Sequence, residues 1–214
     1  MSECCNPSGY DRLFSPREAR RRLRDYDKNG LNAMAQAIVD YLETRGVDGH
    51  RVIEVGGGIG AVQVELLKAG AGSAVNVELS RGYQAVAEDL LRREGLEGRV
   101  EQVIGDFTEL AERMQADDVI MNRVICCYPD MERLMSAGLT ASRHFVGLTY
   151  PRDGFVFRVL LRVENAFHRI RGVDFRAYLH SPHAILDVAR AAGFEVAFAD
   201  RDAMWHGVVL ERAA

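Results

Sequence analysis

The nonapeptide Val-Ile-Glu-Val-Gly-Gly-Gly-Ile-Gly, residues 52–60, organises the rest of this chain. Residues 52–55 suit a buried parallel strand, because three of the four are β-branched and turn residues follow at once. Residues 61–69 have the spacing of a helix that Gly70 ends. A strand, a glycine turn and a helix in this order present backbone N–H groups and the positive end of a helix to a nucleotide-like ligand.

The glycines of the turn admit two classes of ligand. Gly56, Gly58 and Gly60 let the backbone turn sharply, since no Cβ is in the way. With Ala61 they also satisfy the Gly-x-Gly-x-x-Ala pattern of dinucleotide-binding proteins. Glu54 separates the two classes, because a carboxylate at the mouth of the site repels a pyrophosphate and attracts a cation. Glu54 therefore favours a cationic ligand without phosphate.

Residues 54–60 have the pattern Glu-x-Gly-x-Gly-x-Gly. This pattern resembles the first motif of the class I S-adenosylmethionine-dependent methyltransferases, which is an acidic residue, one spacer and Gly-x-Gly-x-Gly. The resemblance covers about residues 48–212. It implies a Rossmann-like α/β fold: a seven-stranded, mostly parallel sheet with its last strand antiparallel and helices on both faces. It also implies S-adenosyl-L-methionine as the cofactor. The alternative is an ordinary strand–turn–helix unit that needs glycine only for packing.

The composition is that of one soluble globular protein. The chain has 214 residues, 48% of them apolar and 27% charged, which suits one compact domain. Within it we expect an N-terminal helical cap, residues 1–46, and a cofactor-binding part, residues 47–214. No secretory signal or membrane-spanning run is visible, and four cysteines then indicate reduced thiols in a cytoplasm. A net charge of −4 without a dense basic patch argues against a nucleic-acid partner. The oligomeric state is left open.

Glu78 is the residue we assign to the ribose of the cofactor. Residues 74–79 predict the second strand, and Glu78 near its end lies 18 residues beyond Gly60. This spacing suits a carboxylate that accepts hydrogen bonds from both ribose hydroxyls. A solvated Glu at the end of the strand is the alternative.

Asp106 and Phe107 follow the third predicted strand, residues 99–104. Methyltransferases of the class that the chain resembles often place an acidic residue here to accept from the adenine amino group, with an apolar neighbour against the ring. We therefore assign both residues to adenine, with Asp106 as the N-cap of the following helix as the alternative. Residues 118–125 predict the fourth strand, whose Asn122 completes the expected cofactor contacts.

Three segments resemble the magnesium-protoporphyrin O-methyltransferase branch of the class. They are Asn-Arg-Val-Ile-Cys-Cys-Tyr-Pro at residues 122–129, Gly-Tyr-Asp-Arg at 9–12 and Ala-Tyr-Leu-His at 177–180. Enzymes of this branch methylate a propionate of a tetrapyrrole. The positions of the branch's catalytic Tyr and His hold Phe14 and Cys127 in this chain. We therefore expect the scaffold of the branch with a different acceptor.

Tyr10, Cys127 and His180 are the candidates for catalysis. In open parallel sheets ligands lie beyond the carboxyl ends of the strands, so the acceptor should meet the methyl group just after the fourth strand. The imidazole of His180 titrates near neutral pH and can take a proton from a hydroxyl or thiol acceptor. A single His is more often a satisfied structural group, and a packed aromatic explains Tyr10 equally well.

The cysteines form two adjacent pairs, Cys4-Cys5 and Cys126-Cys127. Structural zinc sites use spaced pairs instead. Because a strand end sends neighbouring side chains to opposite faces, we expect only one of Cys126 and Cys127 to face the ligand. The first interpretation is small buried hydrophobes and no metal. Alternatively, the N-terminal pair reaches Cys127 and forms a soft thiolate site for a metalloid or heavy metal, or a redox-sensitive disulfide.

The remaining pattern completes the expected sheet and supplies basic segments. Helices are expected at residues 16–27, after the capping Ser15, and at 31–44. Residues 155–171 repeat apolar side chains at helical spacing, with arginines between them. In the resembled class this region commonly supplies the acceptor pocket, and its arginines would attract an anionic acceptor, although a solvated helix face explains them equally well. The last three strands are expected at residues 143–150, 194–200 and 205–211.

The sequence thus predicts an S-adenosylmethionine-dependent methyltransferase that methylates oxygen or sulfur of a small-molecule acceptor, with an anionic acceptor as one option. One alternative is a methyltransferase or sensor for a soft metal or metalloid held by the cysteines. The other is an NAD-type oxidoreductase that uses the same glycine turn. Glu54 and the closing pair of strands argue against the oxidoreductase. The identity of the acceptor stays open.

Overall fold

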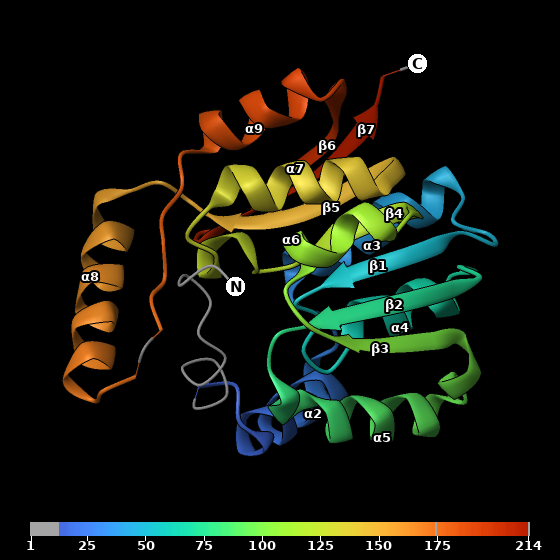
Figure 1. Ribbon diagram of the computed structural model, residues 1–214, viewed down its shortest axis with the longest axis horizontal. Coiled ribbons are helices and arrows are strands. Elements are labelled where there is room, and N and C mark those ends of the chain that lie inside the picture. Colours follow the sequence, from blue (N-terminus) through green and yellow to red (C-terminus); the bar gives the residue numbers. More distant parts are fainter. Residues whose placement is uncertain (1–12, 174, 214) are drawn as a thin grey trace.

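A seven-stranded sheet forms the centre of the protein, with the strand order β3-β2-β1-β4-β5-β7-β6 (Figure 1). The computed structural model describes residues 13–173 and 175–213. Neighbouring strands are parallel except that β7 is antiparallel to β5 and β6. The predicted fold class is therefore confirmed. The strands are β1 (Arg51–Val55), β2 (Ser73–Glu78), β3 (Val100–Ile104), β4 (Ala116–Met121), β5 (Ser142–Pro151), β6 (Phe194–Arg201) and β7 (Trp205–Arg212).

Helices cover both faces of the sheet, and each face has its own hydrophobic cluster. Side chains of α6, α7 and α9 share one cluster with Ile53 and Val55 of β1. Side chains of α2, α3, α4 and α5 share the other with Val52. This alternation along β1 is what a strand buried on both faces requires. The helices are α2 (Pro16–Asn29), α3 (Ala33–Arg45), α4 (Ala61–Lys68), α5 (Gln84–Glu94), α6 (Phe107–Leu110), α7 (Met131–Ala141), α8 (Phe155–Ile170) and α9 (Pro182–Ala191).

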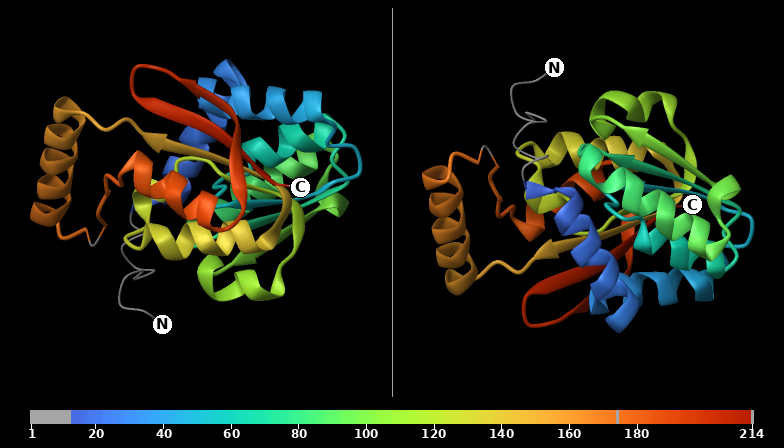
Figure 2. Two further views of the ribbon diagram at one scale, coloured as in Figure 1. Left: turned by 90° about the horizontal axis from the view of Figure 1, so that it is seen from above. Right: turned by 90° about the horizontal axis from the view of Figure 1, so that it is seen from below.

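Helix α8 stands apart from both layers at one side of the molecule (Figure 2). The helix expected at residues 155–171 is therefore present. Its apolar stripe is exposed, with Ile170 at 84% and Val163 at 62% of full exposure. Along residues 13–173 and 175–213, no helix combines the length and the hydrophobicity that a membrane span requires.

The two helices before the sheet begin at side-chain caps. Ser15 accepts from the backbone N–H of Glu18 at 3.4 Å, and Gly30 ends α2 with a φ of 72°. The predicted helix start is thus confirmed. Helix α3 begins two residues later than expected, because Asn32 caps it by accepting from Ala35 at 3.1 Å. Side chains of α3 lie in the same hydrophobic cluster as side chains of β1 and α4. The division into a helical cap, residues 1–46, and a cofactor-binding part stays a prediction.

The end of the fourth strand was predicted wrongly. Strand β4 ends at Met121, and the chain then turns through Arg123, whose φ is 58°, into a short 3₁₀ helix at Ile125–Cys127. The mostly apolar run 118–125 predicts a strand, but a residue in the left-handed conformation, such as Arg123, cannot continue one. Helix α7, which follows, had no counterpart in the sequence prediction. It is capped by Asp130, which accepts from the N–H of Arg133 at 3.0 Å.

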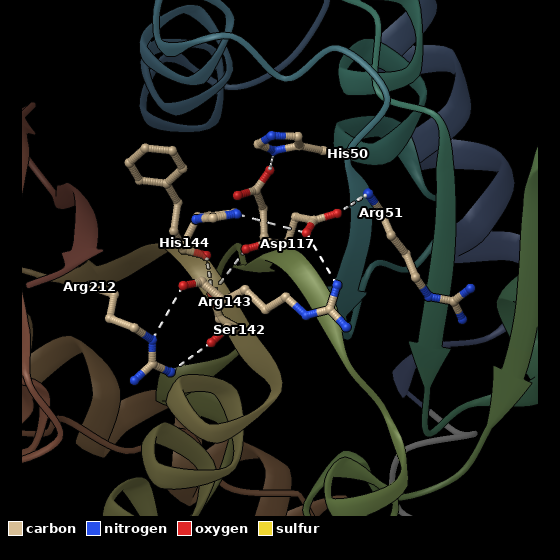
Figure 3. Close-up of polar contacts among 9 residues, drawn as sticks. His50, Arg51, Asp117, Ser142, Arg143, His144 and Arg212 are labelled. Atoms are coloured by element: carbon tan, nitrogen blue, oxygen red, sulfur yellow. Dashed lines mark hydrogen bonds and ion pairs between the residues drawn. The ribbon is translucent and has the colours of Figure 1, made fainter. Parts of the chain in front are cut away.

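Polar contacts close the amino ends of the central strands (Figure 3). His50, just before β1, places Nδ1 2.8 Å from Oδ2 of Asp118 in β4. Asp117 accepts from the backbone N–H of Arg51 at 2.8 Å. Arg212 donates to the backbone oxygen of Ser142 at the start of β5, at 2.8 Å. In open α/β sheets ligands bind at the opposite end, beyond the carboxyl ends of the strands.

Candidate active site

One cavity of about 250 Å³ lies at the carboxyl ends of the central strands. Its walls come from the segment between α2 and α3, the glycine turn, the ends of β2 and β3, and the turn after β4. These strand ends are where the sequence predicts the cofactor. The assigned residues that line the cavity are Glu54, Gly56, Gly58, Glu78, Asp106, Phe107, Asn122 and Cys127.

The glycine turn adopts a backbone that other residues rarely take. Gly56 and Gly58 have φ of 60°, and Gly60, the N-cap of α4, has φ of 76°. Gly57, between them, was not singled out from the sequence. A Cβ on Gly57 would lie 2.5 Å from Oδ1 of Asn76, which no side chain tolerates. The run of three consecutive glycines was the available signal, and a buried Asn on β2 is its physical reason.

Glu54 is buried under the turn, with only 2% of its surface exposed. Its Oε2 accepts from the backbone N–H of Gln63, in the first turn of α4, at 3.0 Å. Burial raises the pKa of Glu54 to about 8; the hydrogen bond from Gln63 lowers it and the charge of Glu78 raises it. With its pKa raised in this way, the carboxyl group keeps its proton to a higher pH than a solvent-exposed Glu does. The carboxyl group expected at the mouth of the site is therefore buried and bound to the first turn of α4, and its contact with a cationic ligand stays a prediction.

Glu78 lies at the end of β2 and joins two turns. Its Oε2 accepts from the N–H of Gly58 at 3.0 Å, and its Oε1 accepts from the N–H of Ser80 at 2.9 Å. The carboxylate therefore faces the cavity from a fixed position next to the glycine turn. Contact with the ribose stays a prediction, and this position is compatible with it.

Asp106 forms the hydrogen bond of an N-cap and also closes the cavity wall. Its Oδ1 accepts from the N–H and the hydroxyl of Thr108, each at 2.9 Å. Its Oδ2 accepts from the hydroxyl of Tyr128 at 2.9 Å. The capping alternative thus describes the ligand-free geometry, while the contact with adenine stays a prediction. Phe107, 3% exposed, lines the same wall. Tyr128 belongs to the segment 122–129 that carries the resemblance, but the sequence suggested no role for its hydroxyl.

Thr149 of β5 fixes the turn that follows β4. Its hydroxyl donates to Oδ1 of Asn122 at 3.0 Å and accepts from the N–H of Arg123 at 2.7 Å. The guanidinium of Arg123 then lies over the ring of Trp205, 4.8 Å from its centre. Both Asn122 and Arg123 line the cavity. The sequence pattern predicts a strand through Arg123 and indicates no role for it.

The vicinal cysteines lie in the 3₁₀ turn after β4, with their sulfur atoms 3.8 Å apart. Cys127 lines the cavity and Cys126 is 8% exposed behind it. Of the two, only Cys127 lines the cavity, and contact with a ligand stays a prediction. The pair lies in a turn and not at a strand end, so the alternation of a strand is not what separates the two side chains. Their S–H···S contact lowers the pKa of Cys126 and raises that of Cys127. The thiol in the cavity wall is thus the one that keeps its proton.

The two other catalytic candidates, His180 and Tyr10, are not among the described residues that line the cavity. Nε2 of His180 lies 2.9 Å from the carbonyl oxygen of Tyr128, so it donates there and anchors its loop. His180 is not among the described residues that line the cavity. Tyr10 and the Cys4-Cys5 pair lie outside the described residues, so their predicted roles are not tested.

Three further observations describe the cavity and its surroundings. Phe14, at the position of the branch's catalytic Tyr, lines the cavity and packs edge-on against Phe175 at 5.7 Å. Within the described part of the chain, no three His, Cys, Asp or Glu side chains gather closely enough to hold a metal ion. Arg22 of α2 lines the cavity, whereas no described residue of α8 does. The basic residues at the cavity are thus Arg22 of α2 and Arg123 of the turn after β4, and none comes from α8.

No protein-family model and no curated protein matches the sequence. Solved structures do match. The magnesium protoporphyrin IX methyltransferase from Synechocystis PCC 6803 with bound SAH has a TM-score of 0.76 and 18% identity, over 97% of this chain and 99% of that one. With bound SAM it has a TM-score of 0.73 and 16% identity, over the full length of both chains. This chain has the class I methyltransferase fold.

A second neighbour with the methyltransferase fold is an O-methyltransferase family protein from Burkholderia thailandensis. Its TM-score is 0.68 at 17% identity, over 98% of this chain and 64% of that one. At such identities the likeness defines the fold, and the methyltransferase fold places ligands at the strand ends where the cavity lies. The chemistry has to be argued from the residues of the cavity itself.

Proposed function

We propose that this protein is an S-adenosylmethionine-dependent methyltransferase whose donor occupies the cavity between the glycine turn and Asp106. The hydrogen bond from Gln63 to Glu54 carries the proposal. In dinucleotide-binding turns the N–H groups at this helix end hold the pyrophosphate. Here a carboxyl group of the protein already accepts from them, which supports a donor without phosphate over NAD.

The cavity offers groups for each part of such a donor. Glu54 is suited to the amino group, Glu78 to the ribose hydroxyls and Asp106 to the adenine amino group, since each carboxylate accepts hydrogen bonds. Phe107 supplies an apolar surface for the adenine ring. These assignments rest on the positions that the residues hold in the resembled motifs, and all four residues line the cavity.

The reaction is an in-line displacement, for which S-adenosylmethionine supplies both the methyl group and a good leaving group. The residues of this chain then align the acceptor and exclude water. Phe14 and the buried Phe107 provide apolar walls for this purpose. No His among the described residues lines the cavity, and the thiol of Cys127 keeps its proton. This favours a small acceptor that ionises by itself, such as a carboxylate or a thiolate, for O- or S-methylation.

Turnover with a panel of acceptors tests the proposal. The protein is incubated with S-adenosylmethionine and tetrapyrrole, carboxylate, phenol, thiol or arsenite acceptors, and S-adenosylhomocysteine is followed by mass spectrometry. We expect acceptor-dependent formation of S-adenosylhomocysteine, strongest with a carboxylate or thiol. Absence of binding of both S-adenosylmethionine and S-adenosylhomocysteine to the folded protein would refute the proposal.

A further inference from the structure

Arg123 is held in an unusual backbone conformation at the cavity. Its φ of 58° makes it the only non-glycine residue with a positive φ in the described part of the chain. The left-handed region costs such a residue free energy, so the surroundings must impose it. They do so through Thr149, whose hydroxyl accepts from the N–H of Arg123 at 2.7 Å. In this conformation Arg123 lines the cavity.

The guanidinium of Arg123 is oriented but not neutralised. It lies 4.8 Å from the centre of the Trp205 ring, which supports the planar group from one side. Its Nε is buried and has no hydrogen-bond partner among the described residues. Burial lowers the pKa of Arg123, and the positive charge of Arg22 lowers it further. An Arg nevertheless stays charged in proteins. A buried donor without a partner is a cost that a bound acceptor atom would remove.

Nearby carboxylates are engaged elsewhere. Asp25 accepts from the side chain of Asn29 at 2.7 Å. Asp202 accepts from the N–H groups of Met204 and Trp205, each at 2.7 Å. No carboxylate of the described residues lies within 4.0 Å of the guanidinium of Arg123 as an ion-pair partner. Asp202 and Asp25 are near enough to favour the charged form of Arg123, but neither pairs with it directly. The cavity wall therefore contains a positive charge without a direct ion-pair partner among the described residues.

Arg22 adds a second positive charge to the same cavity from α2. It lines the cavity and pairs with Glu18, which lies one turn before it, at 2.9 Å. Arg22 and Arg123 thus approach the cavity from opposite parts of the chain, and they are close enough for one charge to lower the pKa of the other. Two guanidinium groups repel one another, and an anion bound between them would offset this repulsion by attracting both.

We propose that Arg123, with Arg22 in support, forms a carboxylate-binding site inside the cavity. A guanidinium matches a planar carboxylate through two parallel hydrogen bonds, which an ammonium group does not provide. Which molecule carries the carboxylate is an inference that rests on the proposed function. The carboxylate belongs either to the amino-acid end of the donor or to the methyl acceptor. In both cases Arg123 fixes one end of a bound molecule against the turn after β4.

Calorimetric titration of four proteins tests the site: wild type, Arg123→Gln, Arg22→Gln and the control Arg190→Gln. Arg190 is an exposed Arg of α9 that pairs with Asp187, so its replacement removes the same charge away from the cavity. The first probes are S-adenosylhomocysteine and 5′-methylthioadenosine, which lacks the amino-acid end. The second pair, phenylacetate and phenylacetamide, is titrated into protein saturated with S-adenosylhomocysteine; the two differ in the carboxylate.

If the carboxylate belongs to the donor, Arg123→Gln should weaken S-adenosylhomocysteine binding roughly 10- to 100-fold and leave 5′-methylthioadenosine unchanged. If it belongs to the acceptor, the variant should keep both nucleoside affinities and lose the preference of the wild type for phenylacetate over phenylacetamide. Arg123→Lys should recover only part of either effect, because it lacks the planar fork. Arg22→Gln should act in the same direction more weakly.

The site is refuted if Arg123→Gln and Arg22→Gln both bind every probe as Arg190→Gln does. Should Arg123→Gln fail to fold, Arg22→Gln decides alone, because Arg22 is half exposed on α2 and can be replaced without cost to the core. Failure of the proposed function has a different signature: the wild type then binds neither nucleoside. In that event phenylacetate and phenylacetamide are titrated into the free protein. A preference of the wild type for phenylacetate that Arg123→Gln loses supports the site, and the lack of such a preference refutes it.

Discussion

Glu54 accepts a hydrogen bond from the backbone N–H of Gln63 at 3.0 Å, and this contact joins the acid of the glycine motif to the first turn of α4. The same carboxyl group lines the cavity. Glu54 is therefore both a helix cap and part of the ligand-binding wall. Since burial raises its pKa to about 8, its charge at neutral pH depends on what is bound beside it.

The stability of the protein should fall as the pH rises toward 8 because of Glu54. Its pKa is about 8 in the folded protein and 4.5 when unperturbed, so between these values the folded state holds a proton that the unfolded state has released. The free energy of unfolding then decreases with pH, by at most about 1.4 kcal/mol per pH unit. Asp118, whose pKa burial also raises, adds to this trend at lower pH.

Urea unfolding of wild type and Glu54→Gln across this pH range measures the effect. The variant cannot titrate at this position, so its free energy of unfolding should vary less with pH than that of the wild type. Glu132→Gln, an exposed position at the start of α7, serves as the control and should keep the wild-type slope. Equal slopes for Glu54→Gln and wild type would show that Glu54 is ionised in the folded state throughout.

Ligand binding should release a proton from Glu54. An ammonium group next to Glu54 favours the ionised form, so S-adenosylhomocysteine should bind more tightly as the pH rises toward 8, by up to about tenfold per pH unit. Calorimetry in two buffers with different ionisation enthalpies gives the number of protons released. In Glu54→Gln both the pH dependence and the proton release should be lost. An affinity that falls with pH in the wild type is inconsistent with this role.

Gly57→Ala should damage the turn although Gly57 lies between the motif glycines. A Cβ there would lie 2.5 Å from Oδ1 of Asn76 and 2.8 Å from Cδ of Glu54. We expect a loss of roughly 1–3 kcal/mol of stability and weaker binding of S-adenosylhomocysteine. Gly98→Ala is the matched control, because nothing lies within 4 Å of its added Cβ. In an Asn76→Ala background the cost of Gly57→Ala should be smaller; full additivity would argue against this clash.

Asp106→Asn separates the cap from the contact with adenine. Asn caps helices as well as Asp does, so the melting temperature should change little. Its amide has one acceptor oxygen, which cannot serve Thr108, Tyr128 and an adenine amino group together. Binding of S-adenosylhomocysteine should weaken about tenfold, while S-inosylhomocysteine, which lacks the amino group, should lose little. An equal loss for both ligands would assign Asp106 to the cap alone.

Local signals in the sequence predicted most of the fold. Ser15, Pro16 and Gly30 mark the two ends of α2 by short-range chemistry, and the structure contains the same caps. The strand, glycine turn and helix around Gly56 and Gly58 were found by the same kind of reasoning, because a positive φ leaves its trace in the residue type.

The parts that were missed depend on partners far along the chain. The turn at Arg123 is imposed by Thr149, 26 residues later, so an apolar segment read as strand was in fact the start of a turn. The need for Gly57 comes from Asn76 on the neighbouring strand, and the burial of Glu54 comes from the packing of α4 over β1. No local pattern contains these contacts.

The central claim is that the cavity under the glycine turn takes an adenosyl sulfur compound and not a dinucleotide. Titration of the purified wild-type protein with S-adenosylhomocysteine and, separately, with NAD tests it most directly. Our account predicts saturable one-to-one binding of S-adenosylhomocysteine that Glu54→Gln weakens, and no measurable binding of NAD. Binding of NAD in the cavity with no binding of S-adenosylhomocysteine would contradict it.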